Sequence, residues 1–96
     1  MNYEVIFRPK AEGHIKEIYD WYELKREGLG EEFLLTFEAT IMLIERNPLT
    51  FAIKHKKFRC VLTPRFPYGI FYFIDEKTIV VVAVLHLSRN PKNWKE

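Results

Sequence analysis

The amino-acid sequence predicts an α+β domain in which a helical hairpin packs on a mainly antiparallel sheet, with the elements in the order β-α-α-β-β-β. Three observations lead to this prediction. A short alternating segment opens the chain, two stretches with helical periodicity follow it, and the last third holds apolar runs rich in β-branched and aromatic residues. Because the chain has 96 residues, we expect a single domain over residues 1–96.

A first strand is expected over residues 3–7, because apolar and polar side chains alternate there and Pro9 ends the segment. From Ala11 the apolar residues recur at intervals of three and four, which is the period of an amphipathic helix. This first helix is expected to run to about Lys25 or Arg26. Its apolar stripe consists of Ile15, Ile18, Tyr19 and Tyr22.

A second helix is expected from about Glu31, after a short turn at residues 28–30 that contains two glycines. The acidic residues of its first turn and Arg46 in its last turn suit the helix dipole, and Asn47-Pro48 ends it. The short turn predicts that the two helices form an antiparallel hairpin. The apolar face of the second helix consists of Phe33, Phe37, Ile41 and Ile44, and Leu34 widens it.

Three further strands are predicted after a linking segment at residues 48–57. The first of them is expected at residues 58–63. Two apolar runs follow, at residues 70–74 and 78–85, and the polar triplet 75–77 between them indicates a strand, a tight turn and a strand. Because both runs are apolar throughout, we expect both faces of this hairpin to be at least partly covered.

The charges are unevenly distributed along the chain, although its net charge is only +2. Residues 1–45 hold ten acidic and five basic residues, a net charge of −5, whereas residues 46–96 hold ten basic and three acidic residues, a net charge of +7. A basic half of this kind favours an anionic partner, either nucleic acid or an acidic peptide. The alternative is a solvated surface on which the charges of the two halves intermix.

Composition argues against several classes of protein. The longest apolar run, of about eight residues, is too short to cross a membrane, and no secretory signal is recognisable, so we expect a cytoplasmic protein. Cys60 is the only cysteine, which excludes an internal disulfide, and its apolar neighbours predict a buried thiol. His14 and His55 have no acid or cysteine at ligand spacing, and no glycine-rich phosphate loop is present, so we expect neither a metal nor a cofactor.

The most specific local pattern lies in the last third of the chain. Residues 65–69, Arg-Phe-Pro-Tyr-Gly, lead into the first apolar run, and His86 ends the second run directly after a leucine. A short basic tail follows, which contains Arg89 and Trp94. This order of features resembles the RelE/ParE superfamily of toxins from bacterial type II toxin–antitoxin pairs, and in particular its ParE-like branch.

The resemblance implies a toxin that has no chemistry of its own, inhibits growth by binding DNA gyrase and is neutralised by a cognate antitoxin. It implies that the residues contacting the target or its phosphates are Arg59, Arg65, Arg89, Lys92 and Trp94. For Trp94, packing back onto the sheet is an equal alternative. Antitoxin contacts are expected at apolar helix residues outside the main stripes, namely Trp21, Leu24, Leu35 and Met42. A homodimer formed through the same residues is the alternative.

A second hypothesis is a ribosome-dependent mRNA endonuclease, as found in another branch of the superfamily. His86 would then exchange a proton near neutral pH, and Arg65 and Arg59 would hold the phosphate, although a structural His86 is an alternative. Members of that branch use a carboxylate after the second helix or a tyrosine near the C-terminus. Here residues 46–74 contain no acid and no tyrosine follows Tyr72, which favours the binding mechanism. A third hypothesis is a non-toxic relic that only binds its antitoxin.

Overall fold

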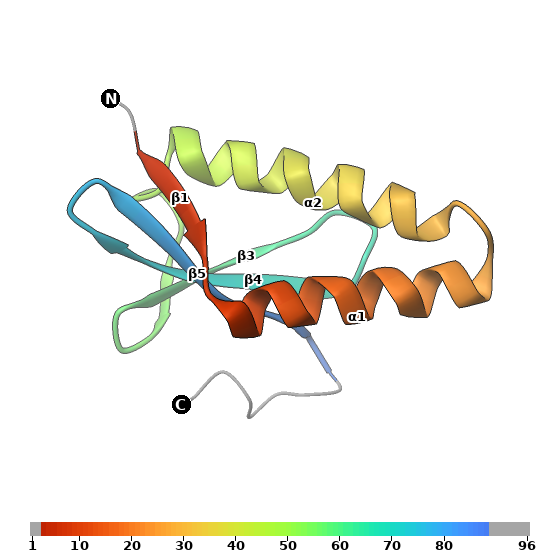
Figure 1. Cartoon of the computed structure of the whole chain (residues 1–96). Helices are drawn as coiled ribbons and strands as arrows, with labels where there is room; N and C mark the ends of the chain where they lie inside the picture. Colours follow the sequence, from red (N-terminus) through yellow and green to blue (C-terminus); the bar gives the residue numbers. More distant parts are fainter. Residues whose placement is uncertain (1–2, 89–96) are drawn as a thin grey trace.

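The structure is a computed structural model that describes residues 3–88 of the chain. Two helices form an antiparallel hairpin that packs on one face of a five-stranded sheet, as Figure 1 shows. The elements in chain order are β1 (Glu4–Phe7), α1 (Pro9–Lys25), α2 (Leu29–Arg46), β2 (Ile53–His55), β3 (Phe58–Leu62), β4 (Tyr68–Asp75) and β5 (Thr78–His86). The predicted α+β class and the predicted helical hairpin are confirmed.

The strands lie in the order β1-β5-β4-β3-β2. Strand β1 pairs with β5 in parallel, and the other three pairings are antiparallel, so the predicted mainly antiparallel sheet is confirmed. The parallel pair follows from the chain path, because α1, α2 and three strands separate β1 from its neighbour β5. None of the helices in the described part of the chain is both long and apolar enough to cross a lipid bilayer.

The structure adds one strand to the predicted order, which becomes β-α-α-β-β-β-β. Strand β2 lies within the segment that was expected to be only a link, and it pairs antiparallel with β3 at the edge of the sheet. The chain reverses at Lys56, whose φ of 53° places it in the left-handed region, and His55 then opposes Phe58. Three residues with a lysine in the middle are too few to show strand periodicity in a sequence.

The helices begin slightly earlier than the sequence predicts. Pro9 occupies the first position of α1, where its missing N–H costs no hydrogen bond. Helix α2 begins at Leu29, so of the predicted turn residues 28–30 only Gly28, with a φ of 89°, lies in the turn, and Gly30 is already helical. The carboxylate of Glu23 stabilises this junction, because its Oε1 accepts hydrogen bonds from the backbone N–H groups of Gly28 (2.7 Å) and Gly30 (3.4 Å).

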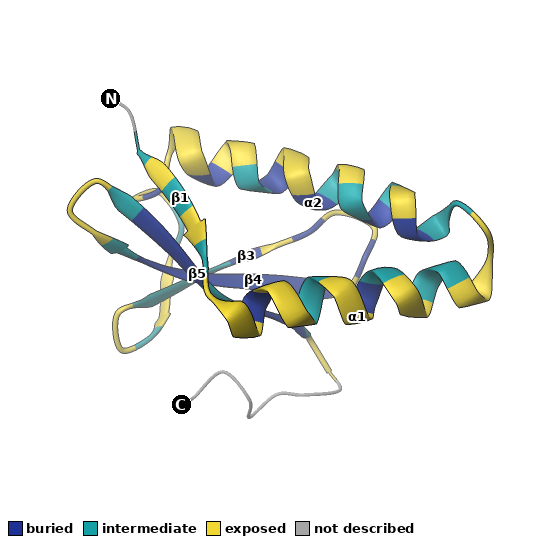
Figure 2. Cartoon of the chain, in the orientation of Figure 1, coloured by how far each residue is buried: buried dark blue, intermediate teal, exposed yellow. Residues whose placement is uncertain are grey.

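The main core lies between the helices and the sheet. Figure 2 shows buried residues on the sides of the helices that face the strands and along β4 and β5. The phenol of Tyr72 is fully buried and donates a hydrogen bond of 2.6 Å to the carbonyl oxygen of Pro48, and burial raises the pKa of Tyr72 to about 12. The predicted apolar stripes are confirmed at their central residues Ile18, Phe33, Phe37 and Ile44, all of which are buried.

A second, smaller cluster covers part of the opposite face of the sheet, which we call the outer face. Phe71, Ala83 and Leu85 are buried there, with Cys60 partly buried beside them. A Cβ atom on Gly69 would lie 2.8 Å from the sulfur of Cys60, so only glycine allows β4 to approach Cys60 this closely. Burial also raises the pKa of the Cys60 thiol. The prediction that both faces of the β4–β5 hairpin are partly covered is therefore confirmed.

Candidate target- and antitoxin-binding surfaces

Arg65 lies in the connection between β3 and β4, and its φ of 71° is unusual for a residue with a side chain. The hydroxyl of Thr63 holds this connection in place by donating to the carbonyl oxygen of Phe66 at 2.7 Å. The Arg65 guanidinium lies over the Phe66 ring, 5.1 Å from its centroid, and donates a hydrogen bond of 2.9 Å to Oε1 of Glu32 on α2. Arg65 therefore links the loop to the helical hairpin.

Glu32 receives a second cation, because Nη2 of Arg26 lies 3.7 Å from its other carboxylate oxygen. The hydrogen bond from Arg65 is the main reason that the pKa of Glu32 is lowered, and the charges of Arg26 and Arg65 act in the same direction. The two arginine side chains remain about 61% exposed, so this cluster lies at the surface. One carboxylate thus organises two guanidinium groups at this end of the molecule.

His86 ends β5 and lies at the same end of the sheet as Arg65. In the strand register it faces Tyr68, and the two rings make an edge-to-face contact with centroids 5.2 Å apart. Its Nδ1 accepts a hydrogen bond of 3.1 Å from the backbone N–H of Ser88, so the neutral ring carries its proton on Nε2. The ring of Tyr22 contacts both Phe66, the neighbour of Arg65, and Tyr68, the partner of His86.

Arg59 has a different position from Arg65. Its Nη1 donates to the carbonyl oxygens of Phe51 (2.6 Å) and Leu49 (3.3 Å), in the segment that follows the C-terminus of α2. Arg65 instead contacts the first turn of α2, and this helix of 18 residues is about 27 Å long. The structure therefore does not bring Arg59 and Arg65 together on one phosphate. Of the other predicted contact residues, Arg89, Lys92 and Trp94 lie outside the described residues.

The four apolar residues predicted to contact an antitoxin are exposed on the helices. Leu24 is 88% exposed on α1, and Leu35 and Met42 are 67% and 59% exposed on α2. Leu35 and Met42 are seven residues apart, so they share the side of α2 that faces away from the buried phenylalanines. Trp21 is 43% exposed, and the ammonium group of Lys25 lies 4.2 Å from its ring centroid.

The uneven charge distribution of the sequence becomes a separation between layers. The helical layer, residues 9–46, carries nine acidic and five basic residues, a net charge of −4. Residues 47–88, which form β2 to β5 and their connections, carry six basic and two acidic residues, a net charge of +4. The helical layer is therefore acidic and the sheet layer basic in net charge, and the ion pair between Arg65 and Glu32 joins the two layers.

The role of His14 has no signal in the sequence. Its Nδ1 accepts a hydrogen bond of 3.2 Å from the backbone N–H of Val84, a donor on β5 beyond the point where β1 stops pairing. Burial lowers the pKa of His14, which keeps the ring neutral and able to accept. Within residues 3–88, no group of three histidine, cysteine or acidic side chains lies close enough to hold a metal ion.

A helical hairpin on a sheet with this strand order defines a toxin-like fold of the RelE/ParE type. Residues 5–91 match the sequence model of a family described as the ParE toxin of the type II toxin–antitoxin system parDE, and the chain therefore belongs to the ParE toxin family. Among solved structures, it resembles a chain from the chromosomal ParDE toxin–antitoxin system of P. aeruginosa, with a TM-score of 0.78 and 14% sequence identity over 88% of this chain and 95% of that chain. At this identity the likeness supports the fold alone. No curated protein matches the chain.

Proposed function

We propose that this member of the ParE toxin family arrests growth by binding its target, with DNA gyrase as the expected target, and that a cognate antitoxin neutralises it. The observation that supports the binding mechanism is that Arg65 and Arg59, the candidate phosphate-holding arginines of an endonuclease, already have partners within the protein. Arg65 is held by Glu32, and Arg59 is held by two backbone carbonyls. Phosphoryl transfer instead needs donors directed at the charge that develops on the reacting phosphate.

Under this proposal Arg65 acts as a contact residue. It is about 61% exposed and stands on a connection that Thr63 and Glu32 hold in place, so it is presented to a partner with little loss of side-chain freedom. Arginine is also one of the residue types that most often dominate the energy of protein interfaces. The antitoxin is proposed to contact the exposed side of the helices through Trp21, Leu24, Leu35 and Met42.

The test is a supercoiling assay with purified gyrase and relaxed plasmid. The proposal predicts that the protein inhibits supercoiling and that cleaved plasmid accumulates, and that Arg65→Ala weakens both effects. Lys16→Gln is the matched control, because it also removes one exposed positive charge but lies on α1 in an ion pair with Asp20. Full inhibition by Arg65→Ala would contradict the role of Arg65, and the absence of any effect of the unsubstituted protein would contradict gyrase as the target.

The mRNA endonuclease stays as the second candidate because one observation favours it. Arg65 and His86 lie at the same end of the sheet, and the rings of Phe66, Tyr22 and Tyr68 connect them. If His86 exchanges a proton in the reaction, His86→Gln should lower the cleavage rate on programmed ribosomes by about 10²–10⁴. A pure binder should keep its toxicity in that variant.

The exposed apolar residues of the helices also permit a homodimer. Size-exclusion chromatography distinguishes a homodimer from an antitoxin complex. It is run on the protein alone and on a mixture with the product of a neighbouring short gene. A one-to-one or higher complex with that product supports the antitoxin contact. A dimer that persists and excludes the product would contradict it.

A further inference from the structure

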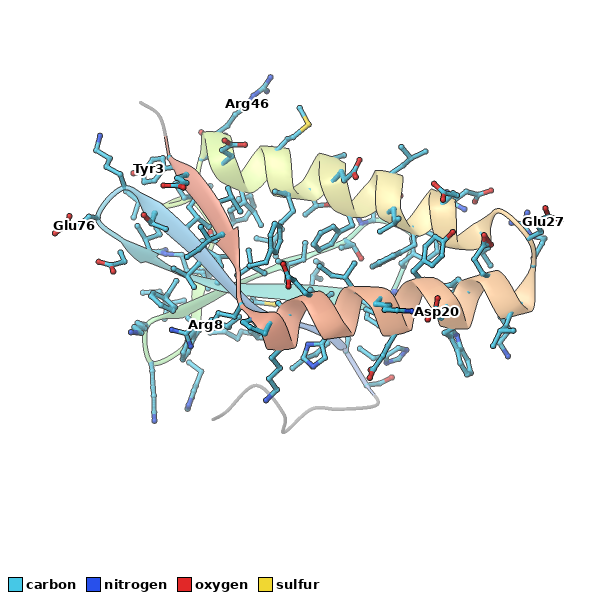
Figure 3. The ribbon with its side chains drawn as sticks, in the orientation of Figure 1. Tyr3, Arg8, Asp20, Glu27, Arg46 and Glu76 are labelled. Atoms are coloured by element: carbon cyan, nitrogen blue, oxygen red, sulfur yellow. The ribbon has the colours of Figure 1, made fainter. Side chains whose placement is uncertain are left out.

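Two cations from distant parts of the sequence lie over the same aromatic ring. The guanidinium carbon of Arg8 is 5.4 Å from the ring centroid of Phe73, and the ammonium nitrogen of Lys57 is 4.1 Å from it. The two charges therefore lie within about 9.5 Å of each other, the sum of the two distances. Arg8 stands between β1 and α1, and Lys57 stands in the turn between β2 and β3. Figure 3 shows Arg8 at the end of the molecule where that turn lies.

Neither cation of this Arg8–Lys57 pair has a carboxylate partner within residues 3–88. The ion pairs of that region join Lys16 to Asp20, and Arg26 and Arg65 to Glu32. Two like charges at this separation repel each other, and a bound anion that attracts both would offset this repulsion. The charged groups of both side chains instead lie over the ring of Phe73, which belongs to the outer face, where Phe58 packs edge-to-face on Phe73 at 5.8 Å.

Further exposed cations lie on β2 and on the turn that carries Lys57. Lys56 adjoins Lys57 in the turn, and both are exposed. Lys54 on β2 is exposed, and its charge acts on the Cys60 thiol, which places it near the outer face. We call this group the outer-face basic cluster, and it consists of Arg8, Lys54, Lys56 and Lys57.

We infer that the outer-face basic cluster binds the phosphodiester backbone of nucleic acid. The ring below the Arg8–Lys57 pair is only 8% exposed, so the centre of the cluster offers charge but no large apolar anchor. Protein interfaces usually depend on such an anchor, whereas backbone binding to nucleic acid depends on cations that neutralise phosphates. Because contacts to phosphates carry no sequence information, the binding should not depend on base sequence. This inference is independent of the identity of the toxin's target.

The test measures fluorescence anisotropy of two labelled probes, a short DNA duplex and a single-stranded RNA, between about 50 and 200 mM salt. The unsubstituted protein should bind at least one probe at the lower salt concentration and lose affinity linearly on a log–log plot. The variant Arg8→Gln/Lys57→Gln should reduce the magnitude of that slope by about 2, roughly one per lost phosphate contact. The two probes distinguish DNA from RNA as the source of the phosphates.

Two controls make the outcome decisive. Lys16→Gln/Lys25→Gln removes the same number of charges from α1 and should leave the slope unchanged. Arg8→Lys/Lys57→Arg keeps both charges and should also keep the slope, which separates charge from packing against Phe73. The inference is overturned if neither probe binds at about 50 mM salt, if both charge-removing variants lower the slope equally, or if polyglutamate competes as well as nucleic acid at equal charge.

Discussion

The carboxylate of Glu32 and the guanidinium of Arg65 meet at 2.9 Å across 33 residues of sequence. This contact joins the first turn of α2 to the β3–β4 connection and sets the position of the arginine that we propose as a target contact. The side chain of Arg65 and the hydroxyl of Thr63 both hold the β3–β4 connection in place. This explains why Arg65 can occupy a left-handed backbone conformation.

The first prediction concerns the protonation of Glu32. Because the hydrogen bond from Arg65 is the largest cause of its lowered pKa, Arg65→Gln should raise the Glu32 pKa toward its ordinary value. A carboxyl with a lowered pKa contributes stability above its unfolded-state pKa and loses it as the pH falls through the folded-state pKa. Carbon-13 NMR titration of the side-chain carboxyl measures the shift, and an unchanged Glu32 pKa in Arg65→Gln would refute the pairing in solution.

The second prediction concerns His14 and acid stability. Burial lowers its pKa, so protonation favours the unfolded chain, and stability should fall as the pH drops below the ordinary histidine pKa of about 6.5 toward the folded-state pKa. His14→Asn keeps a hydrogen-bond acceptor for the Val84 N–H but does not titrate, so it should flatten this part of the pH dependence. His14→Ala should cost about 1 kcal/mol at neutral pH, because the Val84 donor loses its partner. Urea unfolding at several pH values measures both variants, and identical pH profiles for the native protein and His14→Asn would contradict the assignment.

The third prediction compares two helical glycines. A Cβ on Gly30 would lie 2.8 Å from atoms of Glu23 and Tyr19, including a backbone carbonyl oxygen, so Gly30→Ala should destabilise the protein by about 1–3 kcal/mol. Gly13 on α1 has no atom within 4 Å of that position, so Gly13→Ala should stabilise the protein by about 0.5–1 kcal/mol. Thermal and urea unfolding of the two variants measure the difference. Equal effects would show that the helices do not approach as closely as described.

The fourth prediction concerns the antitoxin contact. Leu35→Asp/Met42→Asp places two charges on the exposed side of α2 and should weaken antitoxin binding by at least about 2 kcal/mol, if these residues are central to the interface. The change should remove little packing, because both side chains are mostly solvated, and the lost helix propensity should cost about 1 kcal/mol in total. Calorimetric titration with the antitoxin measures the affinity, and Glu38→Gln on the same helix serves as the control. Unchanged affinity would place the antitoxin on another surface.

Much of the fold could be predicted because its signals are local. The helices follow from spacings such as Phe33 to Phe37, and the β4–β5 hairpin follows from two apolar runs around a polar turn. Strand β2 could not be predicted, because its three residues acquire strand geometry only by pairing with β3. The early start of α2 could not be predicted either, because it depends on a hydrogen bond to Glu23 on the preceding helix.

The candidate binding surfaces were less predictable, because they depend on contacts between distant residues. Exposure of Leu24, Leu35 and Met42 followed from helical periodicity. The pairing of Arg65 with Glu32, the separation of Arg59 from Arg65 and the hydrogen bond from Val84 to His14 are tertiary relationships that leave no spacing pattern in the sequence. The meeting of Arg8 and Lys57 over one ring is of the same kind.

We propose that this ParE-family protein stops growth by binding a target that acts in replication. The most direct measurement is pulse-labelling with thymidine and methionine in the first minutes after induction in cells that lack the antitoxin. Our account predicts that thymidine incorporation falls first, while methionine incorporation continues. An earlier fall in methionine incorporation would contradict it and would make Arg65 and His86 the residues to examine for catalysis.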